Sequence, residues 1–121
     1  MRSQTVAVLG ASDNPERYAH RAVLLLREHG HRVLPVNPGL ETIAGLPVVK
    51  SLDALPAVET LTLYVGAARL PSLQEEIVRL RPGRVIFNPG TESRELQAAL
   101  TAAGIPWQEA CTLVLLRTGQ F

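Results

Sequence analysis

The residues in this chain best suited to binding a ligand are small and polar ones that come directly after apolar, strand-like runs. The first group is Gly10, Ala11 and Ser12, which follows residues 5–9 (TVAVL) and precedes Arg17. Glycine allows a tight turn, small side chains let backbone N–H groups approach an anion, and the positive end of a following helix favours phosphate. An ordinary strand-to-helix turn would use the same residue types, so the loop predicts either a phosphate site or a plain turn.

Similar groups follow the next three strand-like runs. They are Val36-Asn37-Pro38, then Gly66-Ala67-Ala68-Arg69, and finally Asn88-Pro89-Gly90. In an open parallel sheet the carboxyl ends of the strands share one edge, and ligands bind there. We therefore expect a flat ligand to lie across these ends, although ordinary loops would also use many of these residue types.

Two departures from a common fingerprint disfavour NAD as that ligand. A G-x-G-x-x-G loop would place glycine where this chain has Ser12 and Pro15. NAD binding also calls for a carboxylate at the end of the second strand, and this chain has Asn37 there. NADP stays open, because Arg17, Arg21 or Arg32 could meet its 2′-phosphate.

Neither the cysteine nor the histidines form a catalytic or metal-binding pattern. Cys111 is the only cysteine, which excludes an internal disulfide and disfavours a cysteine-based zinc site. It follows the fifth strand-like run with no adjacent cation to stabilise a thiolate, so we expect a mostly buried, unreactive thiol. His20, His29 and His31 lack an acidic partner at metal-like spacing. We therefore expect no metal, and we favour a protein without catalytic activity of its own.

The elements that must position these residues alternate between strand and helix patterns. Short apolar runs, typical of strands buried on both faces, fall at residues 5–9, 32–36, 60–65, 84–87 and, more weakly, 107–108. Helical spacing of apolar residues lies between them, at 19–26, from Pro71 to Leu80, and at 96–103 after a cap at Thr91 or Ser93. Residues 38–56 are rich in proline and glycine, with a short helical pattern near 51–55. This alternation predicts an α/β, Rossmann-like, doubly wound and mainly parallel five-stranded sheet with helices on both faces.

Composition limits the class of protein further. The 121 residues fit a single domain, 1–121, and 46% hydrophobic with 19% charged residues is typical of a globular chain. A net charge of +1 gives no reason to expect nucleic acid or an anionic membrane as a partner. The sequence contains no segment like a signal peptide or a membrane span, so we expect a cytoplasmic protein.

Taken in order, these motifs resemble the CoA-binding-domain proteins, which stand alone or form the first domain of succinyl-CoA synthetase α-subunits. The matching stretches are VLGASDNPER from Val8, VLPVNP from Val33, LYVGAA from Leu63, FNPGTES from Phe87 and GIPWQEACT from Gly104. The chain departs from the pattern of many relatives at Tyr18, Leu40 and Phe87-Asn88. The resemblance implies a Rossmann-like domain in which the nucleotide part of CoA lies against the loops after the first four strands.

The resemblance also implies roles for individual residues. The turn at 10–12 and Arg17 would face phosphates, 36–38 would flank adenosine, 64–67 would shape the centre, and 88–90 would border the pantetheine path. The residues assigned in this way are Gly10, Ala11, Ser12, Arg17, Val36, Asn37, Pro38, Tyr64, Gly66, Ala67, Asn88, Pro89 and Gly90.

Coenzyme A or an acyl-CoA is accordingly the expected ligand. The expected function is its non-catalytic binding, as a carrier, a sensor or a regulatory partner of a protein in acyl-CoA metabolism. Two alternatives stay open: an NADP- or other nucleotide-dependent oxidoreductase, and an interaction module that has lost its ligand.

Overall fold

Strands buried on both faces form the centre of the molecule. In the computed structural model, which describes residues 2–121, five parallel strands pair in the order β2-β1-β5-β6-β7. The strands are β1 (Thr5–Leu9), β2 (Arg32–Val36), β5 (Thr60–Leu63), β6 (Arg84–Phe87) and β7 (Trp107–Glu109). The predicted Rossmann-like α/β fold with its five-stranded parallel sheet is confirmed.

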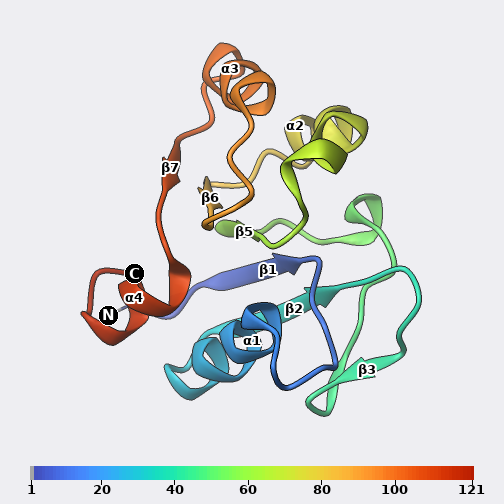
Figure 1. Cartoon of the computed structure of the whole chain (residues 1–121), viewed down its shortest axis with the longest axis vertical. Coiled ribbons are helices and arrows are strands. Elements are labelled where there is room, and N and C mark those ends of the chain that lie inside the picture. Colours follow the sequence, from blue (N-terminus) through green and yellow to red (C-terminus); the bar gives the residue numbers. More distant parts are fainter. Residues whose placement is uncertain (1) are drawn as a thin grey trace.

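Two helices cover each face of this sheet, α1 with α4 on one side and α2 with α3 on the other (Figure 1). Because side chains alternate along a strand, Val6 packs on the α1–α4 side and its neighbour Ala7 on the α2–α3 side. Among the described residues, no helix is long and apolar enough to cross a bilayer. The helices are α1 (Tyr18–Glu28), α2 (Gln74–Leu80), α3 (Arg94–Ala102) and α4 (Thr112–Arg117).

Helix α3 begins at its predicted cap, whereas α2 begins later than predicted. Ser93 caps α3, since its Oγ accepts a hydrogen bond from the Leu96 N–H at 3.2 Å. Pro71 was expected to open the second helix but instead lies inside a 3₁₀ segment, η2 (Ala67–Leu73), and α2 begins at Gln74. A 3₁₀ turn is common at the amino end of an α-helix, and this one buries Leu70 in the core.

The proline- and glycine-rich region contains more structure than its sequence predicted. A small antiparallel hairpin joins β3 (Thr42–Ile43) to β4 (Leu46–Pro47), with both turn residues, Ala44 and Gly45, at positive φ. The short helical pattern near 51–55 corresponds to the 3₁₀ turn η1 (Leu52–Ala54). The strands β3 and β4 were not predicted, because two residues are too few to show an alternating pattern. Helix α4 was not predicted either.

His31 is a buried histidine at the amino end of β2. Its Nδ1 accepts a hydrogen bond from the Gln4 N–H at 3.0 Å, so the neutral imidazole fits this position. Its ring lies 5.0 Å from that of Phe121. Burial, followed by the nearby charges of His29 and Arg84, lowers the pKa of His31.

We therefore expect His31 to make the fold sensitive to acid. Because the pKa of His31 is lower when folded than the unfolded value of 6.5, its contribution to stability is present above that pH and is lost as the pH falls below it. Urea unfolding between about pH 7.5 and 5.5 should show a shallower decline for His31→Gln than for the wild type. The control His29→Gln removes an exposed imidazole and should keep most of the decline; an unchanged decline in His31→Gln would refute the assignment.

Candidate functional site

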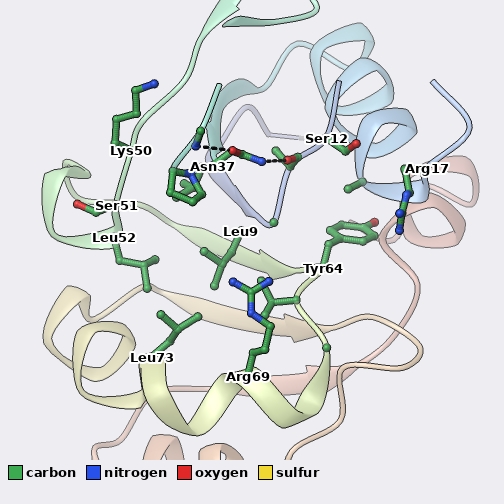
Figure 2. A pocket seen from close by; sticks show the side chains of 18 of the residues that line it. Leu9, Ser12, Arg17, Asn37, Lys50, Ser51, Leu52, Tyr64, Arg69 and Leu73 are labelled. Atoms are coloured by element: carbon green, nitrogen blue, oxygen red, sulfur yellow. Dashed lines mark hydrogen bonds between the residues drawn. The ribbon is translucent and has the colours of Figure 1, made fainter. Parts of the chain in front are cut away.

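A cavity of about 910 Å³ opens at the carboxyl ends of β1, β2 and β5 (Figure 2). From β1 the chain crosses to β2 on one side and later to β5 on the other, so the cavity lies at the topological switch point of the sheet. The predicted site residues that line it are Gly10, Ala11, Ser12, Arg17, Val36, Asn37, Pro38, Tyr64 and Gly66. The topology thus brings together residues from the first three strand ends.

Gly10 is required where it is, for two physical reasons. Its φ of +85° favours glycine, and a Cβ there would lie 2.9 Å from the Tyr64 carbonyl oxygen. The N–H groups of Gly10 and Ala11 both donate to the Val36 carbonyl at 3.2 Å, so they hold the first loop against the second instead of facing an anion. Of the three N–H groups of this turn, that of Ser12 is the one without a bond of this kind among the described residues, so it is free to meet a ligand.

Asn37 fixes the wall between the two loops. Its Nδ2 donates to the Ala11 carbonyl at 2.9 Å, and its Oδ1 accepts from the Gly39 N–H at 2.8 Å. Its own N–H donates to the Val49 carbonyl at 3.0 Å. Both polar atoms of the Asn37 side chain therefore bond to the protein, and they hold the first and second loops together at the cavity wall.

Positive charge predominates along the cavity. Arg17 is the N-cap of α1 and makes no side-chain cap, which leaves the positive end of this 11-residue helix open to an anion. Arg69 and Lys50 also line the cavity, whereas Glu76 is the one carboxylate among its described lining residues. In Figure 2, Arg17 and Lys50 lie at opposite ends of the view, with Arg69 between them.

Tyr64 and Gly66 shape the third loop. The Tyr64 hydroxyl is buried beside Thr62 and Thr112, and burial raises the pKa of Tyr64, so the phenol stays neutral. Gly66 has an ordinary φ of −56°, and a Cβ there would meet no atom within 4 Å. The fold itself therefore does not require glycine at position 66, which is exposed and lines the cavity.

The remaining predicted site residues lie outside the lining of this cavity: Ala67, Asn88, Pro89 and Gly90. Asn88 is buried, and its Nδ2 donates to Thr62 Oγ1 at 2.6 Å and to the Leu63 carbonyl at 2.8 Å. Its Oδ1 accepts from the Thr112 N–H at 2.9 Å. Asn88 thus ties β5 to the start of α4, and a role for 88–90 along a pantetheine path stays a prediction.

Cys111 is only partly exposed, which agrees with the expectation of a mostly buried thiol. The cysteine is the N-cap of α4, where the chain leaves the sheet and partly exposes the side chain. It does not line the cavity. Within residues 2–121, no three His, Cys, Asp or Glu side chains gather as they would around a metal ion.

Sequence reasoning missed several lining residues. Lys50 and Ser51 come from the proline- and glycine-rich region, and Tyr18 begins α1. Arg69 was noticed as a cation after the third strand but was not assigned to the site. No local pattern marks Lys50, because it reaches the cavity only through the parallel bridge between Val49 and Val36.

The family of the chain follows from a match that covers nearly all of it. The model of a CoA binding domain family matches residues 4–117. The chain belongs to the CoA binding domain family. The family resemblance inferred from the motifs is confirmed, and the cavity lies within the matched residues.

Two solved structures are similar to the chain over nearly all of its length. A solved structure from Thermus thermophilus, cell-free ID.343, is 37% identical to this chain in sequence, with a TM-score of 0.89. The match covers 98% of this chain and 91% of the Thermus thermophilus chain. A crystal structure of an uncharacterized protein, 36% identical, covers 100% of both chains with a TM-score of 0.94.

Two further comparisons are more limited. The uncharacterized protein YneT of Bacillus subtilis is 30% identical over 78 residues, which are 64% of this chain and 58% of YneT. A dinucleotide-forming acetyl-coenzyme A synthetase 1 from Ca. Korarchaeum cryptofilum, solved with phosphate and ADP, has a TM-score of 0.75 over 89% of this chain and 25% of its own. At 18% identity, this synthetase shares the fold alone.

The contacts of Asn88 predict a structural role that stability measurements can test. Asn88→Asp would bury a carboxylate against the Leu63 carbonyl, and we expect a loss of about 3–5 kcal/mol in the free energy of unfolding. The control Asn14→Asp alters an exposed asparagine and should change stability by less than about 0.5 kcal/mol. Equal stability of the two variants would contradict the role of Asn88.

Proposed function

We propose that this protein binds coenzyme A or an acyl-CoA reversibly in the cavity at the carboxyl edge of its sheet, without transforming it. The observation that carries the proposal is a cavity rimmed by cations at the open end of α1, in a chain of the CoA binding domain family. Its volume of about 910 Å³ is of the size that suits a large cofactor.

The diphosphate of the ligand would lie over the first loop. The Ser12 N–H, the uncapped start of α1 and the Arg17 guanidinium offer donors and positive charge there. Arg69 approaches from the third loop and would contribute further charge. A small residue at position 12 would let the backbone come close to the anion.

The less polar parts of the ligand would lie along the apolar walls. Val36 and Pro38 border the cavity at the end of β2, where adenosine would pack, while Leu9, Leu52 and Leu73 line its interior. Asn37 offers no carboxylate to a ribose and has its amide engaged by the loops. This arrangement favours CoA over NAD.

A binding role without catalysis fits the groups that face the cavity. Its described lining includes Glu76 but neither histidine nor cysteine, and the phenol of Tyr64 has a raised pKa. The protein would then act as a carrier, a sensor or a regulatory partner in acyl-CoA metabolism.

A thermal-shift comparison tests the proposed ligand. CoA should raise the melting temperature in a concentration-dependent way, because a ligand that binds only the folded state stabilises it. NADPH at equal concentration should not. Stabilisation by NADPH alone would favour the oxidoreductase alternative, and no shift with either ligand would favour an interaction module without a ligand.

Substitutions at Gly66 should change CoA affinity without changing the free energy of unfolding. Gly66→Leu should leave the free energy of unfolding within about 0.5 kcal/mol of the wild type, because its φ is ordinary and its Cβ meets nothing. The leucine would occupy ligand space and should weaken CoA binding by about tenfold or more. Gly66→Ala should have a smaller effect; wild-type affinity in both variants would remove position 66 from the site.

Arg17 should contribute binding energy without contributing much to stability. Arg17→Ala removes a charge-assisted hydrogen bond to a phosphate and should cost about 1.5–3 kcal/mol of CoA binding by isothermal titration. Arg21→Ala is the matched control, since Arg21 lies in the helix that Arg17 caps, over the Tyr18 ring, and does not line the cavity. Equal losses in both variants would indicate a general charge effect and not a contact.

A further inference from the structure

His20 lies in the first turn of α1 and bonds back to the loop that follows β1. Its Nδ1 is 2.9 Å from the Ser12 carbonyl oxygen. A carbonyl oxygen can only accept a hydrogen bond, so Nδ1 carries the hydrogen and donates it. His20 is half-buried and is not among the described residues that line the cavity. The imidazole therefore contacts the loop from outside the cavity lining.

Three polar groups at Ser12 and on the peptide before it are bound within the protein. The Ser12 carbonyl accepts from His20, and Ser12 Oγ accepts from the Asn14 N–H at 3.0 Å. The preceding carbonyl, that of Ala11, accepts from Asn37 Nδ2 at 2.9 Å. The Ser12 N–H is the one polar group here without a protein partner among residues 2–121.

The two peptide planes beside Ser12 are thus each held by a side chain. A peptide unit is planar, and in the trans form its N–H and C=O point in opposite directions. The bond from Asn37 to the Ala11 carbonyl therefore sets the direction of the Ser12 N–H. The bond from His20 ties the next plane to α1, so the free N–H keeps a fixed position relative to the start of this helix and to Arg17.

The chemistry of the first turn of α1 fits this arrangement. Acidic side chains are favoured at the amino end of a helix, because they interact well with its positive end. The first turn of α1 contains none. An imidazole at this place braces the loop without bringing a negative charge to the point where an anion would bind.

Building on the proposed function, we propose that His20 is a positioning residue for diphosphate binding. Its bond to the Ser12 carbonyl holds the free Ser12 N–H where the diphosphate of the ligand can accept a hydrogen bond from it. His20 itself makes no contact with the ligand in this arrangement. The affinity for CoA then depends on a hydrogen-bond donor at the place of His20 Nδ1, and not on the size of the side chain.

Isothermal titration with CoA tests this assignment. His20→Leu has similar bulk but no donor, and it should weaken CoA binding about three- to tenfold, the range that one neutral hydrogen bond contributes. His20→Asn carries its Nδ2 as far along the side chain as Nδ1 of histidine, so it should restore most of the lost affinity. His20→Ala also lacks the donor and should show the same loss as His20→Leu. Alanine favours the helix, so this variant tests the assignment even where leucine disturbs the fold.

His29→Leu is the matched control. His29 Nδ1 also lies 2.9 Å from a carbonyl oxygen, that of Leu25, but His29 is the C-cap at the other end of α1 and does not line the cavity. Removal of this bond should leave the affinity for CoA unchanged.

The Ser12 amide proton provides a readout that a purely structural role of His20 would not move. In proton–nitrogen NMR spectra of the wild type, CoA should shift this proton downfield, because a phosphate oxygen accepts a charge-assisted hydrogen bond from it. At saturating CoA the shift should be smaller in His20→Leu and should return in His20→Asn.

The outcomes separate this inference from the function on which it rests. If wild-type protein does not bind CoA, the proposed function fails. If CoA binds and His20→Leu and His20→Ala keep the wild-type affinity, CoA binding stands and the positioning role of His20 is overturned. Equal losses in His20→Leu, His20→Asn and His29→Leu, or a Ser12 amide proton that CoA does not shift in the wild type, would also overturn it.

Discussion

The close approach of three loops at Gly10 is the constraint on which the rest of the site depends. The Val36 carbonyl accepts hydrogen bonds from the Gly10 and Ala11 N–H groups, and the Tyr64 carbonyl would be 2.9 Å from a Cβ at position 10. Only glycine fits there, because it has both the required positive φ and no side chain. This contact draws the ends of β1, β2 and β5 together and leaves the cavity above them.

Hydrogen bonding by Asn37 extends this constraint to the cavity rim. Its side-chain amide joins Ala11 to Gly39, so the first and second loops cannot separate without breaking both bonds. The site is therefore largely formed in the absence of a ligand. Preformed walls lower the ordering cost of binding, which supports the proposed reversible binding of a ligand.

The polar groups of the protein divide into those that support the fold and those that face the cavity. Asn88, Thr62 and Thr112 satisfy one another inside the molecule and connect the sheet to α4. Arg17 and Lys50 lie exposed at the rim, where Lys50 pairs with Glu41. Buried polar groups need partners within the protein, whereas exposed cations can keep or exchange theirs at little cost.

The sequence by itself determined the five-stranded sheet and the loops around Gly10, Asn37 and Gly66, because continuous apolar runs and turn residues act locally. The tertiary structure alone decided that Lys50 joins the cavity and that Asn88 lies outside it. Lys50 reaches the rim through pairing of Val49 with β2, and such a contact between distant residues leaves no local pattern. Asn88 resembles a ligand residue by position, but burial turned its amide toward β5 and α4, where unpaired polar groups are costly.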